Sequence, residues 1–271
     1  MRARFRDENR KGSAFGKLAG ALFGFGFFFG SFFVLWTNEG RVNFGEVAQD
    51  SVVIEADAPG SVDPEQLVAA VGDLRSDELL SDPKFIKVGS YVQLNRTVEM
   101  YAWEEDERTE DEETYYEYTA VWTEYPENSD SFYDTYYYNP PMPFQSQSFT
   151  VSNATVGQLS FDPRSIEYPE GEPVALSKQM LVPEIASNRD IAIYGDYIYV
   201  GFSTMSNPEI GDLRVSYTAV VPSQNVTVFG RVSGDKLVPY TVKDDEILYR
   251  LFLTDPESAT VQMEEEYQLS K

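Results

Sequence analysis

Hydrophobic residues form one long uninterrupted run near the N-terminus, and beyond it they mostly alternate with polar residues. The run Leu18–Thr37 reads LAGALFGFGFFFGSFFVLWT and contains no charged residue. A helix rises about 1.5 Å per residue, so a run of this length spans about 30 Å, the hydrocarbon thickness of a bilayer. Trp36 stands at its outer end, where an amphipathic ring prefers the membrane interface. The run therefore predicts a transmembrane helix.

The charges on the two sides of this run predict its orientation. Residues 1–17 carry six Lys/Arg against Asp7 and Glu8, whereas the chain as a whole has a net charge of −24. Basic flanks are retained in the cytoplasm. We therefore expect a cytoplasmic tail over 1–17, a transmembrane helix over 18–37, and a periplasmic or extracellular domain over 38–271. A cleaved signal peptide is the alternative, but the apolar run is too long and no small-x-small cleavage site follows it.

Small residues gather on one face of the predicted membrane helix. At 100° per residue, five glycines share an arc of about 160°, and three pairs of them are four residues apart. This face predicts packing against another transmembrane helix, although Phe23 and Phe27 lie in the same arc. The alternative is that glycine is simply frequent in membrane helices. The five residues are Gly16, Gly20, Gly24, Gly26 and Gly30.

After Arg41, the alternation of hydrophobic and polar residues predicts mostly β-strands. The pattern is clearest over 213–219. A helix over 64–75 is also considered, because Asp63 is a suitable cap, although the valines in this range suit a strand equally well. The fold class is therefore mainly β (α+β): one N-terminal transmembrane helix followed by a large, antiparallel, β-rich extracytoplasmic domain, with two β subdomains divided near 130–150 as an option. Further strands are expected over 91–103, 114–125, 197–202, 226–232 and 237–242, with weaker candidates over 48–55 and 154–161.

Composition excludes several kinds of site. The chain has no Cys and no His, which rules out disulfides, Ser-His-Asp and Cys-His nucleophiles, Cys/His zinc sites and a histidine pH switch within it. The net negative charge argues against nucleic-acid binding. We therefore expect neither a cofactor nor a catalytic residue. The densest acidic run, 104–113 (EEDERTEDEE), is expected to be a solvated hairpin tip between two strands, with weak cation binding as the alternative.

Two further groups of polar residues are candidate sites. Strand alternation over 98–103 places Glu99, Tyr101 and Trp103 on one face. If that face is buried, Glu99 needs a cationic partner, for which Arg96 or Arg214 would serve; if it is exposed, the face is a contact surface for a ligand or partner. A catalytic role for Glu99 is a third reading. The second group lies directly after the membrane helix, where its charges either stop the helix from sliding inward or couple it to the domain: Asn38, Glu39, Gly40 and Arg41.

Tyrosines 133–138, together with Trp122, form an aromatic group with two interpretations. They are either a surface that faces lipid headgroups or another copy of the chain, or a strand packed in an aromatic core.

Five short stretches, taken together and in order, resemble the transmembrane protein 43 family, also called LUMA. They extend over about residues 37–243 and contain, besides the residues already named, Asp82, Pro83, Gly211, Asp212, Gly234, Asp235 and Pro239. The resemblance implies a membrane protein with its first helix at the N-terminus and a large lumenal or extracytoplasmic domain, and it supplies no catalytic residues. The stretches are Thr37–Arg41, Leu79–Pro83, Arg96–Trp103, Gly211–Tyr217 and Gly234–Tyr240.

The resemblance also implies a location and a role. In animals the family is associated with the endoplasmic reticulum and the inner nuclear membrane, where it organises membrane proteins and self-associates; a role in membrane stress is suggested for prokaryotic relatives. The acidic pI of about 4.2 favours a prokaryotic member in a bacterial plasma membrane. Family members usually continue into about three more hydrophobic helices, whereas the longest apolar run here after residue 243, Ile247–Leu253, is interrupted by Arg250. The chain is therefore either truncated or a single-pass variant.

These observations predict a non-enzymatic scaffold or assembly protein. Its expected partners are the lipid bilayer, other copies of itself as a homo-oligomer, and other membrane proteins, with no nucleic acid. The alternative is an extracytoplasmic sensor or binding module for a lipid, a cation or an envelope component. An enzyme that uses paired carboxylates is a third possibility.

Overall fold

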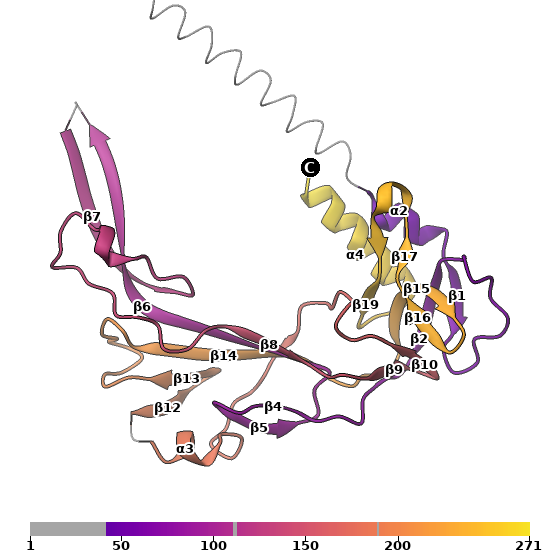
Figure 1. Ribbon diagram of the computed structural model, residues 1–271, viewed down its shortest axis with the longest axis horizontal. Helices are drawn as coiled ribbons and strands as arrows, with labels where there is room; N and C mark the ends of the chain where they lie inside the picture. The colour runs from indigo at the N-terminus through magenta and orange to yellow at the C-terminus, as the bar shows by residue number, and fades with distance from the viewer. Residues whose placement is uncertain (1–41, 111–112, 189) are drawn as a thin grey trace, which may run out of the picture.

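The computed structural model describes residues 42–110, 113–188 and 190–271 (Figure 1). The predicted membrane helix with its five glycines, and the stretch 38–41 that follows it, lie outside these residues. Within the described ranges, no helix combines the length and the hydropathy needed to cross a bilayer. The described chain is mainly β, as predicted.

The first large sheet has eight strands in the order β1-β2-β15-β16-β10-β9-β3, with β19 also paired to β15. Neighbours are antiparallel except for the pairs β1–β2 and β10–β16, which are parallel. The strands are β1 (Val52–Glu55), β2 (Val68–Gly72), β3 (Leu74–Arg75), β9 (Ala154–Val156), β10 (Leu159–Phe161), β15 (Val226–Ser233), β16 (Lys236–Val238) and β19 (Arg250–Phe252).

The second large sheet is antiparallel and is organised around one long strand, β6 (Gln93–Glu110). The first half of β6 pairs with β14 on one edge and with β8 on the other, and its second half pairs with β7. Figure 1 shows the β6–β7 hairpin extending away from the rest of the molecule. The other strands are β7 (Glu113–Thr123), β8 (Gln147–Thr150), β11 (Glu172–Pro173), β12 (Ile191–Tyr194), β13 (Tyr197–Val200) and β14 (Leu213–Val220).

Short elements complete the fold. Two small hairpins pair β4 with β5 and β17 with β18. Both large sheets take strands from before and after residues 130–150. The remaining elements are β4 (Leu80–Asp82), β5 (Ile86–Gly89), β17 (Tyr240–Thr241), β18 (Ile247–Leu248), α2 (Phe44–Gln49), α3 (Pro183–Ala186), α4 (Pro256–Leu269) and the 3₁₀ turns Ser129–Ser131 and Lys243–Asp245.

One hydrophobic core connects the two large sheets. The inward residues of β6, Val98 and Met100, are fully buried with Val215 of β14, and the same cluster continues to Val228 of β15. Each of these strands buries one face and partly exposes the other, which explains why hydrophobic and polar residues alternate in this part of the sequence. A smaller cluster packs α2 and α4 onto the other face of the first sheet, around Phe229.

Helix α4 begins with a well-formed cap and ends beside α2. Asp255 is its N-cap and accepts a hydrogen bond from the backbone N–H of Ser258 at 3.0 Å. A Cβ on Gly45 would lie only 2.8 Å from the backbone nitrogen of Glu264, so glycine permits the close approach of the two helices. Asn43 then donates a hydrogen bond to Glu264 at 2.7 Å. The first and last described turns of the chain therefore lie side by side (Figure 1).

The structure corrects several predicted elements. The helix considered over 64–75 is wrong: Asp63 accepts a hydrogen bond from the N–H of Glu65, but the turn stops there, and β2 follows between β1 and β15. The predicted strand over 48–55 is β1 preceded by the short helix α2. The predicted strand over 154–161 divides into β9 and β10 because Gly157, at φ +54°, makes a turn between them.

The acidic run 104–113 lies in the hairpin formed by β6 and β7, but most of it is strand instead of tip. Residues 104–110 continue β6, and Glu113 already belongs to β7. Tyr and Thr residues on β7, which favour strands, pair with this acidic stretch and extend the hairpin.

Candidate functional site

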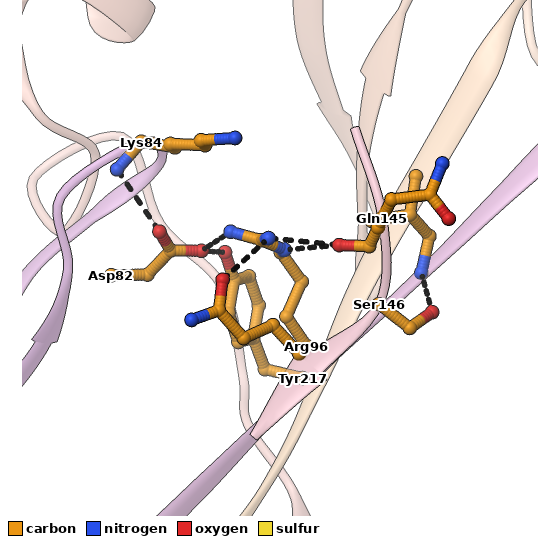
Figure 2. Close-up of polar contacts among 8 residues, drawn as sticks. Asp82, Lys84, Arg96, Gln145, Ser146 and Tyr217 are labelled. Atoms are coloured by element: carbon orange, nitrogen blue, oxygen red, sulfur yellow. Dashed lines mark hydrogen bonds and ion pairs between the residues drawn. The ribbon is translucent and has the colours of Figure 1, made fainter. Parts of the chain in front are cut away.

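A buried ion pair connects two of the stretches that carry the family resemblance. The Nη1 atom of Arg96 on β6 lies 2.5 Å from the Oδ2 atom of Asp82 at the end of β4, and each side chain is only 1% exposed. The hydroxyl of Tyr217 on β14 donates to the same oxygen at 2.6 Å, and the backbone N–H of Lys84 donates to Oδ1 at 3.0 Å. Figure 2 shows these donors converging on Asp82. Three separate segments are thereby joined at one carboxylate.

The rest of the Arg96 guanidinium is also satisfied. Its Nε and Nη2 atoms donate to the backbone oxygen of Gln145 at 3.1 and 2.8 Å, and Nη2 donates to the side chain of Gln147 at 3.2 Å. The rings of Phe85 and Phe149 lie 5.6 and 5.7 Å from the guanidinium carbon. A buried charge with this many partners is held in one orientation.

Burial and the neighbouring Asp82 carboxylate also affect Tyr217. Desolvation raises the pKa of the Tyr217 phenol far above its usual range, and the hydrogen bond to Asp82 raises it further. Tyr217 therefore stays protonated and acts as a hydrogen-bond donor. This cluster holds the fold together.

A second ion pair lies on the opposite face of β6. Arg214 donates from Nε and Nη2 to both carboxylate oxygens of Glu99, at 2.6 and 2.7 Å. The two side chains are 22% and 19% exposed. The guanidinium also stacks over the rings of Trp122 and Tyr197, at 4.9 and 5.0 Å from their centroids. The hydrogen bond to Glu99 raises the pKa of Arg214 above its usual value. Of the two arginines considered for Glu99, the structure pairs it with Arg214.

A third carboxylate, Asp212, closes the loop that precedes β14. The hydroxyls of Tyr199 and Ser203 both donate to its Oδ2 atom, Tyr199 at 2.5 Å, and the backbone N–H of Glu209 donates at 2.8 Å. Burial, followed by the hydrogen bond to Asp212, raises the pKa of Tyr199 to about 12. Gly201 is required here, because a Cβ would lie 2.1 Å from the carboxylate.

The remaining family residues form turns. Gly211 adopts φ +97° and donates its N–H to the oxygen of Tyr101 at 2.9 Å, which continues the pairing of β6 past β14. Gly234, at φ +66°, makes the turn between β15 and β16 together with Asp235, whose oxygen accepts from the N–H of Ser160. Pro239 separates β16 from β17.

The predicted aromatic group covers one face of the β6–β7 hairpin. We call residues 129–138 the tyrosine loop. Within it, Tyr137 stacks on Tyr118 of β7 with ring centroids 3.8 Å apart, and Tyr133 stacks on Tyr116 at 4.3 Å. Glu105 of β6 accepts from the Tyr118 hydroxyl at 2.5 Å and from the Tyr133 N–H at 2.7 Å. The group is therefore a loop packed on a sheet face, and it is not a strand.

Asn139 fixes this loop to the edge of β6. Its side chain accepts from the N–H of Trp103 at 2.7 Å and donates to the oxygen of Trp103 at 2.8 Å, so it replaces a neighbouring strand. The side chain of Glu127 accepts from the N–H of Glu105 at 3.0 Å. Outer rings of the loop stay exposed, including Tyr133 at 73% and Tyr136 at 83%.

A hollow opens where the tyrosine loop meets the segments on its two sides. Its volume is about 580 Å³, and its lining includes Glu124, Glu127 and Asp130 together with Tyr125 and Tyr138. None of the three carboxylates makes an ion pair with a described residue. In the part of the chain that the structure describes, no three acidic side chains converge closely enough to hold a metal ion.

Sequence reasoning assigned no role to Tyr217, Tyr199 or Asn139, which complete these networks. The alternation of side chains along a strand was one available signal. Arg96 and Glu99 are three residues apart in one strand, so their side chains point to opposite faces of the sheet. Alternation therefore excludes Arg96 as the partner of Glu99. Asn139 had no comparable signal, because its partner lies on a strand 36 residues away.

Comparison with known proteins gives matches over most of the chain. The family model described as Transmembrane protein 43 matches residues 100–268. Proteins named Transmembrane protein 43 from Pongo abelii and Homo sapiens are 34% and 33% identical to this chain over 247 residues, which is 82% of this chain and 60% of each relative. The Transmembrane protein 43 homolog of Drosophila melanogaster is 28% identical over 239 residues, covering 81% of this chain and 62% of the relative. The chain thus spans about three fifths of these relatives. No solved structure gives a significant match.

Proposed function

Because this chain belongs to the transmembrane protein 43 family, we propose that it is a membrane-anchored, non-enzymatic scaffold that self-associates and brings membrane proteins together. The relatives are transmembrane proteins by name. The anchor and its orientation rest on the sequence: an uncharged run over 18–37 with basic residues before it and acidic residues after it. The extracytoplasmic position of the β domain, its link to membrane stress and the prokaryotic origin stay predictions.

One observation carries the scaffold proposal: exposed tyrosines are concentrated on and around the projecting hairpin. Tyr133 and Tyr136 of the tyrosine loop are largely exposed, and Tyr115 on β7 and Tyr138 at the end of the loop are about half exposed. Tyrosine is enriched at protein–protein interfaces, because one rigid ring supplies both contact area and a hydroxyl. The ring of Tyr133 stacks on Tyr116 of β7 and the ring of Tyr136 contacts Tyr137, so little side-chain entropy is lost when a partner covers these two rings.

The charged residues of the family stretches support the same proposal in another way. Asp82, Glu99 and Asp212 each accept hydrogen bonds from within the fold. A general acid or nucleophile has to be accessible to a substrate. These carboxylates instead fix the strands that position the hairpin.

Site-specific photo-crosslinking in native membranes tests the scaffold. A benzophenone amino acid at Tyr133 or Tyr136 is expected to give adducts with another copy or with other membrane proteins. The same amino acid at Glu65, an exposed position on a loop before β2, serves as the control and is expected to give fewer adducts. A chain that stays strictly monomeric and free of adducts at every position would refute the scaffold.

The hollow beside the tyrosine loop favours a second candidate, an extracytoplasmic binding module for a cationic or lipidic ligand. Carboxylates and tyrosine rings together suit an ammonium group, through charge and cation–π attraction. Thermal unfolding of the full chain in detergent, with and without saturating phosphocholine or calcium, tests this role. A binding module gains stability with one of these ligands, and an unchanged unfolding temperature removes the candidate.

A further inference from the structure

The outer edge of β7 is a long strand edge with no partner among the described residues, where β7 pairs only with β6. The N–H groups of Tyr101 and Trp103 point away from β7, toward Asp212 and Asn139. Hydrogen-bonding directions alternate along a strand. The even-numbered residues of β6 therefore face β7, and the even-numbered residues of β7 turn their N–H and C=O groups outward. These are Thr114, Tyr116, Tyr118, Ala120 and Trp122.

This edge lacks the usual protection against pairing. No hydrogen bond among the described residues involves its outward backbone groups. The strand reads ETYYEYTAVWT, which is rich in aromatic and β-branched residues and contains neither Lys nor Pro. Its pairing with β6 runs from Thr123 to Glu113 without a bulge. Free edges are normally blocked by lysine, proline or a bulge. Among the described residues, negative charge is the only such feature that discourages pairing here.

Two of these negative charges face each other on one side of the hairpin. Asp106 of β6 lies directly opposite Glu117 of β7, and both side chains are exposed. Neither forms an ion pair with a described residue. Like charges directly opposite each other destabilise a strand pair. A cationic side chain placed beside Glu117 would therefore relieve a repulsion that already exists in the free protein.

We infer that the β7 edge binds a basic, extended segment of a partner protein, which joins the second sheet as an additional strand. The inference deepens the scaffold proposal and rests on it. Main-chain hydrogen bonds to the five outward residues supply affinity, and lysine or arginine side chains opposite Glu117 and near Asp106 select the partner. The exposed ring of Tyr115, on the same face, adds a surface for cation–π contact.

Charge complementarity separates this occupant from two others. A second copy of the chain would bring one acidic hairpin against another, because the run 104–113 is acidic apart from Arg108 and Thr109. Anionic lipid headgroups are repelled by the same charges. A basic polypeptide is attracted by both the charge and the unpaired backbone.

Peptide binding to the full chain in phosphatidylcholine nanodiscs tests the inference by fluorescence anisotropy. The probe is a labelled peptide, long enough to pair with all of β7, in which lysine alternates with valine and threonine. Two matched probes separate the contributions: one with glutamate in place of lysine, and one that keeps every lysine but has prolines at alternate uncharged positions. The lysine peptide is expected to bind at least about tenfold more tightly than either, and more weakly as salt increases.

Two protein variants locate the binding site. Ala120→Pro removes one outward N–H that β6 does not use, a change that edge strands tolerate. Asp106→Asn with Glu117→Gln removes the facing charges and leaves the backbone intact. Each is expected to weaken binding of the lysine peptide about tenfold. Asp57→Asn with Glu65→Gln makes the same change in charge at exposed positions beside the first sheet and is expected to leave binding unchanged.

The outcomes decide the inference separately from the scaffold proposal. Equal binding of the proline-containing peptide, no effect of the charge-neutral pair, or no binding at all would overturn the inference. If Ala120→Pro lowers the unfolding temperature, the charge variant and the peptide pair still decide. Photo-crosslinks at Tyr133 that persist in both variants, with peptide binding absent, would leave the scaffold standing and show that partners dock elsewhere.

Discussion

Replacing Asp82 with asparagine is expected to cost more stability than any other single change of one charged group in this domain. The asparagine would keep the shape of the side chain, but its single amide oxygen could accept from only one of the two donors, the Tyr217 hydroxyl or the Lys84 N–H. Arg96, however, would stay buried at 1% exposure without its counter-ion. Removal of one partner from a buried ion pair costs about 3–5 kcal/mol. We expect Asp82→Asn to lie in this range.

The same structure provides a matched control. Asp73 and Arg75 form an ion pair at 2.8 Å, but their side chains are 31% and 66% exposed. Exposed ion pairs contribute about 0–1 kcal/mol, so Asp73→Asn should fall below about 1 kcal/mol. Both variants lose one negative charge, and their difference therefore isolates the effect of burial.

Urea denaturation of the full chain in a mild detergent, followed by far-UV circular dichroism, measures both losses. In a double-mutant cycle, Arg96→Met should recover part of the loss caused by Asp82→Asn, because the double variant has no unpaired buried charge; the coupling is expected to be about 0.5–3 kcal/mol. If Asp82→Asn costs no more than Asp73→Asn, the account of a desolvated ion pair fails.

Three further predictions test other parts of the structure. Gly157→Ala should cost more stability than Gly60→Ala in the same urea assay. Both glycines have positive φ, which costs an alanine about 1–2 kcal/mol, but only at Gly157 would the added Cβ also clash, 2.6 Å from a backbone carbonyl carbon. Equal losses of stability would contradict this. Arg214→Lys keeps the charge but loses the bidentate hydrogen bond to Glu99, and should lower the free energy of unfolding by about 1.5 kcal/mol. An unchanged thermal unfolding temperature would refute this prediction. Hydrogen bonds from a backbone N–H onto Asp255 and from side-chain amides onto Glu264 lower both pKa values from 3.8 and 4.5, so their stabilising contribution is complete above those values and is lost as pH falls below them. The amide protection factors of α4 should accordingly fall at acid pH before those of β14, and simultaneous loss would count against this order.

The sequence predicts strands well where one face is buried and the other is wet. In β14, Leu213, Val215 and Tyr217 are buried while Arg214 and Ser216 between them are half-exposed, so alternation marks the strand and its inner face. The same holds for the first half of β6. Such patterns are local, and a one-residue shift in register would expose every buried side chain.

Helix α4 escaped the same reasoning because its hydrophobic signal is weak. Only Ala259 and Met263 of this helix are buried, and most of its other residues are polar. The residues at its start nevertheless indicate a helix N-terminus, because Asp255 caps it and Pro256 occupies its first turn. A search for capping residues, independent of hydrophobic periodicity, would have found the N-terminal end.

The ion-pair partners depend on tertiary geometry. Asp82 and Arg96 lie in different sheets, and Tyr217 follows Asp82 by 135 residues. The sequence identified each segment through the family resemblance but did not show that they meet. The free edge of β7 could not be predicted from the sequence either, because the hydrophobic pattern of a strand does not show whether it lies at the edge of its sheet.

The contact between α2 and α4 has a mechanical consequence. Asn43 and Glu264 are bonded although 221 residues separate them, and Gly45 allows their helices to touch. A pull on the chain before Asn43 and an opposing pull after Ser270 therefore meet at this junction. A force applied between these two ends of the chain would be carried by the contact between α2 and α4, and the strands of the two sheets would not have to separate.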